Sequence, residues 1–168
     1  MRNSFFLKYL ILTAAQAILG NFLNLSPYIT LCFLPAMVLC LPGRMGSLQV
    51  MIIAFLTGLA VDFTTHGILG LTVAALLPVA FFRNGLLSIV LGNEAISRRE
   101  NLSVGKQGMA KVALCILLCS AIFFAIYAWI DAAGTRSFGF NLLRTVLSTL
   151  VSTVAGLPVA TLLTEGED

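Results

Sequence analysis

The residues best placed to do chemistry are Asp62 and His66, four positions apart in an otherwise apolar stretch. On a continuous helix this spacing puts a carboxyl group and an imidazole on one face, where they could exchange a proton. Thr64 and Thr65 precede the histidine and Gly67 follows it, so the pattern favours a polar loop instead. A lone loop histidine with no other group converging on it is typical of a solvated side chain.

The four cysteines offer a second possible chemistry. Cys115 and Cys119 are one helical turn apart, a spacing that can ligate a metal ion, but no histidine or acidic residue lies within a turn of them. The others, Cys32 and Cys40, also lie inside apolar runs, where cysteine packs as a small hydrophobic residue. We therefore predict packed thiols, with no disulfide, metal site or cofactor.

Recognisable catalytic motifs are missing from the sequence. It contains no Walker phosphate-binding loop, no HExxH and no GxSxG. Catalysis needs clustered acids, bases, nucleophiles or metal ligands, and the chain has a single histidine. We expect a protein that is not an enzyme, and nothing in the sequence supports nucleic-acid binding.

Asp62 still needs an explanation, because it is the only acidic residue in the first half of the chain. An acid within an apolar run must be partnered, neutralised or close to the membrane interface. Two interpretations stay open: a cap or headgroup contact at a tight helical hairpin, or a structural or partner contact. Small residues at four-residue spacing suit close helix packing. The residues that we expect to pack in this hairpin, or to contact a partner, are Ala54, Gly58, Asp62, Gly70 and Ala74.

The overall composition places these residues in a membrane. The 168 residues are 59% hydrophobic and 10% charged, against about 25% charged in soluble proteins. No polar stretch is long enough for a separate domain, so residues 1–168 are predicted to form a single transmembrane domain. The fold class predicted is an all-α integral membrane protein with about six transmembrane helices in one bundle. The apolar runs are residues 5–25, 27–41, 47–63, 68–82, 112–130 and 141–163.

Three of these runs raise particular questions. The first continues past the cleavage-like Ala15-Gln16-Ala17, so we expect an uncleaved helix. The second is short and contains Pro35; it either spans with a kink or dips in and returns, and we expect the span. The fourth ends at Arg83-Asn84-Gly85, a predicted membrane exit, after which Leu86 to Leu91 is a helix extension or a surface segment.

The last run carries a ladder of small residues at four-residue spacing, formed by Ser148, Ser152, Gly156 and Ala160. Such a ladder lets another backbone approach closely. We expect it to receive a helix from within the bundle or from a partner protein.

Charged residues predict the orientation. Six spans put both termini on one side, and that side would hold eight basic residues against two on the other, Arg136 and Arg144. The positive-inside rule makes the eight cytoplasmic. Four of them, in or next to the longest polar connection, could attract anionic lipid or a cytoskeletal partner, or serve orientation only: Arg98, Arg99, Lys106 and Lys111.

The order of these features resembles the rod shape-determining protein MreD family, in its Bacteroidetes-like form. The likeness lies in Asn21, Asn24 and Pro27-Tyr28, and above all in the run from Phe55 to Phe63, which is similar to the family's F-x-x-G-L-x-x-D signature. It is specific across about residues 21–85, and the later helices match in hydropathy alone. The turn at residues 64–67 departs from the family pattern, which leaves the role of that segment less defined.

This resemblance implies a non-enzymatic scaffold subunit of the cell-wall elongation complex in the bacterial inner membrane. Its implied partners are MreC, the actin-like MreB, RodA and the elongation transpeptidase. The family is similar in architecture to the substrate-binding subunits of energy-coupling-factor vitamin transporters, which supplies the alternative function. Such a subunit would need an outward pocket, for which the candidates here are Trp129, Asp131, Asn141 and Asp62.

Overall fold

The chain is described here by a computed structural model that covers residues 2–22, 30–65, 68–92, 108–132 and 137–164. All regular secondary structure in these ranges is helical. Four helices in these ranges are long and apolar enough to cross a membrane, which agrees with the predicted all-α membrane protein, while the count of six spans stays a prediction. The helices are α1 (Arg2–Phe22), α2 (Leu34–Leu39), α3 (Ser47–Thr64), α4 (Leu71–Leu91), α7 (Met109–Ala132) and α8 (Phe138–Thr164).

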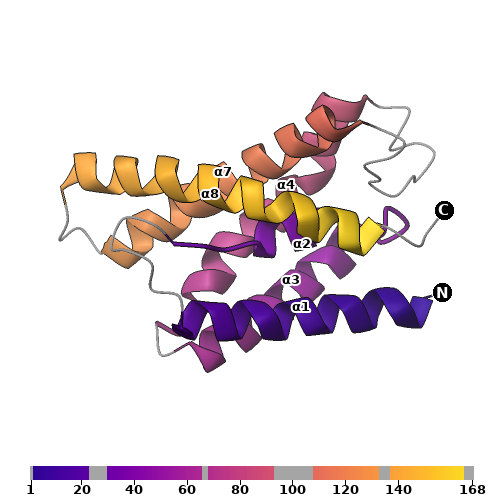
Figure 1. Ribbon diagram of the computed structural model, residues 1–168, viewed down its shortest axis with the longest axis horizontal. Coiled ribbons are helices and arrows are strands. Elements are labelled where there is room, and N and C mark those ends of the chain that lie inside the picture. The colour runs from indigo at the N-terminus through magenta and orange to yellow at the C-terminus, as the bar shows by residue number, and fades with distance from the viewer. Residues whose placement is uncertain (1, 23–29, 66–67, 93–107, 133–136, 165–168) are drawn as a thin grey trace.

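In the described ranges the short helix α2 lies inside a bundle of longer helices and contacts α4, α7, α8 and, less, α1 (Figure 1). Each longer helix packs against the next in the order α1, α3, α4, α7, α8, and α2 lies among α4, α7 and α8. The start of α1 and the end of α8 lie at the same end of the molecule (Figure 1). The buried apolar residues of the described ranges form a core cluster that includes every apolar residue of α2 but Pro35.

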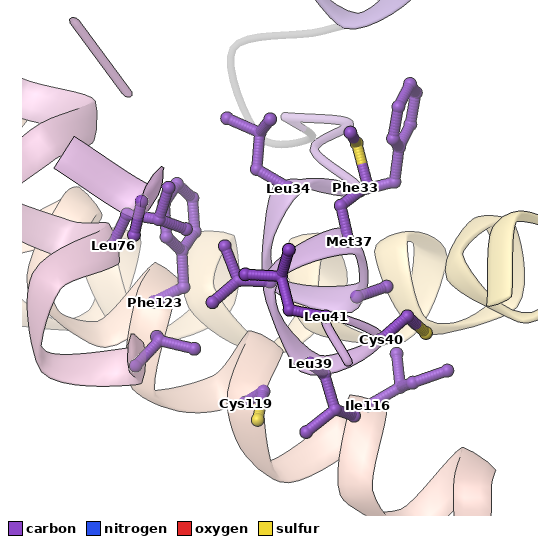
Figure 2. Packing of buried hydrophobic residues seen from close by; sticks show 14 of the residues in the cluster. Phe33, Leu34, Met37, Leu39, Cys40, Leu41, Leu76, Ile116, Cys119 and Phe123 are labelled. Carbon is purple, nitrogen blue, oxygen red and sulfur yellow. The ribbon is translucent and has the colours of Figure 1, made fainter. Parts of the chain in front are cut away.

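Helix α2 is too short to be stable by itself, since isolated helices of a few residues do not hold together in water. All of its side chains are buried. Figure 2 shows Leu34, Met37 and Leu39 of α2 surrounded by residues of other helices, including Leu76 of α4 and Ile116 of α7. Packing on every side is what stabilises it.

The prediction of one kinked helix across the second apolar run is wrong for the residues described. Residues 30–33 lie outside any helix and bond to α8 and α1 alternately, as an extended chain does, and the helix covers only Leu34–Leu39. Pro35 lies in the first turn of α2, where its missing N–H costs no helical hydrogen bond. The proline therefore begins a helix here and does not bend one.

The fourth predicted helix is longer than expected and does not end at Arg83. Helix α4 continues through Arg83 to Leu91, so residues 86–91 are a helix extension. The Arg83 side chain is only 2% exposed. The third, fifth and sixth predicted helices are confirmed as α3, α7 and α8, with ends that differ by a few residues.

Candidate functional site

Asp62 forms the cap of the next helix. Its carboxylate is buried at the end of α3 and accepts the backbone N–H groups of Gly70 at 2.9 Å, Thr72 at 3.1 Å and Val73 at 3.4 Å. The N–H groups of a first helical turn have no partner within their own helix. Asp62 supplies the missing acceptor, and its negative charge lies at the positive end of the α4 dipole.

The small residues leading to Asp62 allow α3 and α4 to approach closely. Ala54 and Gly58 are buried on the same face as Asp62, as predicted. A Cβ atom added to Gly58 would lie 3.0 Å from the Val73 Cα atom and 3.1 Å from its N atom. Only glycine, which has no Cβ atom, therefore lets the backbones of α3 and α4 come this close at this position.

The second half of the expected pattern has a different role. Gly70 adopts a φ of +93°, a left-handed conformation that favours glycine, and it forms the turn into α4. Ala74 is exposed and takes no part in packing inside the chain. Neither residue packs in the hairpin, and the alternative expectation, contact with a partner, stays a prediction.

We expect Asp62→Ala to destabilise the fold more than Asp62→Asn. The alanine variant leaves several buried N–H groups without an acceptor and removes a charged cap, at a cost of about 1–3 kcal/mol. Asparagine keeps one acceptor oxygen and loses only the charge. Thermal unfolding in detergent micelles measures the order, and equal midpoints for the two variants would contradict the capping role.

The ladder on α8 binds the extended segment of the same chain. Ser148 Oγ accepts the Thr30 N–H and Ser152 Oγ accepts the Cys32 N–H, both at 3.0 Å. A Cβ atom at Gly156, also on the ladder, would approach Ala36 of α2 and Ile116 of α7 to 3.0 Å. Of the two expected occupants, the ladder thus receives an element from within the bundle.

Gln16 of α1 holds the other edge of this segment. Its Nε2 donates to the Leu31 carbonyl at 3.2 Å, and its Oε1 accepts the Phe33 N–H at 3.0 Å. The donor and the acceptor of the Gln16 amide thus take the places that the N–H and C=O groups of a neighbouring strand would take. Sequence reasoning missed Gln16, although a buried amide in the middle of an apolar helix is itself a signal.

Arg83 is a second missed residue. Its Nε donates to the Leu39 carbonyl at 3.1 Å and its Nη2 donates to the Leu41 carbonyl. These carbonyls lie at the C-terminal end of α2, where the helix supplies no partner and the dipole favours a cation. Arg83 therefore caps α2 from α4.

A further polar cluster lies at the junction of α7 and α8. Arg144 forms an ion pair with Asp131, donates to Thr30 Oγ1 at 3.2 Å and lies 5.9 Å from the centre of the Tyr127 ring. Asn141, one turn before Arg144, is buried, and no residue that the structure describes contacts its Oδ1 by a hydrogen bond. Trp129 is half exposed and contacts Phe138 edge to face, 5.4 Å between ring centres.

Several predicted residues lie outside the described ranges. They are His66, Arg98, Arg99 and Lys106. Lys111 lies in the first turn of α7 and is exposed. Cys115 and Cys119 are buried free thiols, and the described parts of the chain contain no group of three or more potential metal ligands.

No known protein family, curated protein or solved structure matches the chain significantly. The arrangement of its own residues is therefore the basis for inference. The buried side chains of Gln16, Asp62, Arg83, Ser148 and Ser152 all bind backbone groups of the same chain. Polar side chains that bond to backbone groups in this way stabilise non-helical backbone inside an apolar bundle, where water cannot do so.

Proposed function

We propose that this protein is a non-enzymatic membrane scaffold subunit of the bacterial cell-wall elongation complex, as its resemblance to MreD implies. The observation that carries the proposal is the geometry of the signature residues. Gly58 admits the α4 backbone, and Asp62 caps the same helix one turn later. A signature that builds a rigid hairpin is what a scaffold requires.

The use of the buried polar groups also supports this function. The buried side chains of Gln16, Ser152, Asp62 and Arg83 bond to backbone groups of the same chain and do not line a common ligand pocket. A scaffold needs such internal bracing because its task is to keep faces in a fixed arrangement. A transporter or enzyme would instead direct several polar side chains at a substrate.

In this proposal the chain crosses the bacterial inner membrane six times, and the extended segment with α2 makes the second crossing. Both termini are cytoplasmic. The common end of α1 and α8 supports this topology, as does the hydrogen bond from Lys8 Nζ to the Leu162 carbonyl at 2.9 Å. Basic residues near that end would meet anionic lipid.

The partners proposed are MreC first, then MreB, RodA and the elongation transpeptidase. Because the ladder and the α3–α4 contact face are filled from within, partners would use the outward apolar faces. On α3 this face includes Phe55, Leu59 and Phe63, of which Phe63 is 83% exposed. Lipid and partner helices would compete for the same surface.

One observation favours the alternative function, a substrate-binding subunit of an energy-coupling-factor vitamin transporter. Asn141 lies one turn before Arg144, which pairs with Asp131. Its buried Oδ1 atom accepts no hydrogen bond from the residues described. A ligand that donates a hydrogen bond could use that acceptor after local rearrangement. The cluster remains the place to look if uptake is found.

Affinity purification distinguishes the two functions. The tagged full chain is extracted from native membranes in mild detergent, and mass spectrometry identifies what accompanies it. MreC or RodA is the expected result. An ATPase pair with a coupling membrane subunit, and no elongation protein, would overturn the scaffold proposal. The Phe63→Ala variant, which changes an exposed side chain only, should reduce recovery of the partner if the α3 face binds it.

A further inference from the structure

The helices of the bundle do not all pack equally well against their neighbours. Consecutive helices from α1 to α8 pack along their faces, whereas α8 and α1 barely touch each other directly. In Figure 1 these two helices lie across the front of the molecule, and the purple chain leading into α2 runs between them. The boundary between α1 and α8 is therefore filled by the extended segment, residues 30–33, and not by helix packing.

Hydrogen bonds join this segment to both helices. On the α8 side, Ser148 and Ser152 accept two of its N–H groups. On the α1 side, Gln16 makes the two bonds to Leu31 and Phe33. At one end, Lys8 Nζ donates to the Leu162 carbonyl in the last turn of α8.

The two sides differ in how firmly they hold the segment. It continues directly into α2, which is buried among α4, α7 and α8. Helix α1 packs chiefly on α3, where the Tyr9 hydroxyl donates to Thr57 Oγ1 at 3.1 Å, since the Thr57 proton is given to the Ile53 carbonyl. The segment thus belongs to the α8 side, and α1 is attached to it by Gln16.

We propose that the bundle opens at the boundary between α1 and α8, with α1 turning on its contact with α3 and Gln16 holding the boundary closed. Opening breaks the Gln16 and Lys8 bonds and leaves the α8 side intact. It also uncovers the Leu31 carbonyl and the Phe33 N–H, which lipid cannot satisfy. A partner that supplies both a donor and an acceptor at that depth would therefore favour the open state.

The native cysteines measure this opening in the full chain. Cys32 lies in the extended segment and Cys115 in the core between helices, and both are buried. The protein in lipid nanodiscs is treated with N-ethylmaleimide, and modification of each cysteine is followed by mass spectrometry of its peptide. Cys32 should react on the order of tenfold faster than Cys115, because local opening needs less free energy than unfolding of the core.

Gln16→Leu should raise the Cys32 rate on the order of tenfold, as expected for two lost interhelical bonds, and leave the Cys115 rate unchanged. Tyr9→Phe removes a bond of the same helix on the α3 side and should not change the ratio of the two rates. If Gln16→Leu does not fold, Lys8→Met should raise the Cys32 rate in the same direction. Equal rates for Cys32 and Cys115, or a Cys32 rate that neither Gln16→Leu nor Lys8→Met raises, would overturn the proposal.

Discussion

Gly58→Leu should prevent the α3–α4 hairpin from closing, with most of the protein lost to aggregates. Even Gly58→Ala places a Cβ atom about as near as 3.0 Å to the Val73 backbone, which cannot rotate away. Overpacking of this kind costs about 1–3 kcal/mol for one added carbon, and a leucine adds three more. The monodisperse fraction on size-exclusion chromatography and the thermal unfolding midpoint measure both effects.

Two other glycines provide graded controls for this prediction. Gly156→Ala meets side-chain atoms of Ala36 and Ile116, and the isoleucine can shift, so a smaller loss of stability is expected. Gly85 of α4 has open space around its Cβ position. Gly85→Ala should be neutral or stabilise by up to about 1 kcal/mol through helix propensity. If Gly58→Ala unfolded at the same temperature as Gly85→Ala, close contact of α3 and α4 would not be essential.

The same contact explains what sequence could predict. Small residues every four positions, followed by an acid, have few structural meanings in an apolar run, so the Ala54, Gly58 and Asp62 face was predictable. Packing within the chain does not follow the pattern beyond the turn, because Gly70 is needed for its backbone conformation and Ala74 faces outward. Spacing alone does not distinguish a small residue that packs from one that turns.

Helix α2 and its extended approach were not predictable for a different reason. Hydropathy describes side chains, and by that measure the second run resembles any other apolar span. The decisive property is where its backbone groups find partners, and these lie more than 100 residues away at Ser148 and Ser152. Gln16 and the two serines together make an extended backbone tolerable inside an apolar bundle.

Arg83 was assigned to the membrane surface because an arginine at the end of an apolar run usually marks an exit. Its location depends on α2, whose short length the sequence did not reveal. Once α2 ends inside the bundle, its last carbonyls need donors, and a guanidinium offers five N–H groups in a fixed planar arrangement. The early end of α2 and the burial of Arg83 therefore depend on each other.

Arg83→Leu should therefore destabilise the bundle strongly, although it removes the cost of burying a cation. Apolar replacement of a buried charge is tolerated when both partners are replaced, but here the Leu39 and Leu41 carbonyls would remain without donors, at a total cost of about 2–5 kcal/mol. Arg83→Lys should be intermediate, because one ammonium group lacks the planar fork that bonds both carbonyls. Arg44→Leu changes an exposed arginine and is the matched control. Thermal unfolding in micelles gives the comparison, and a midpoint for Arg83→Leu equal to that of Arg44→Leu would show that α2 does not need its cap.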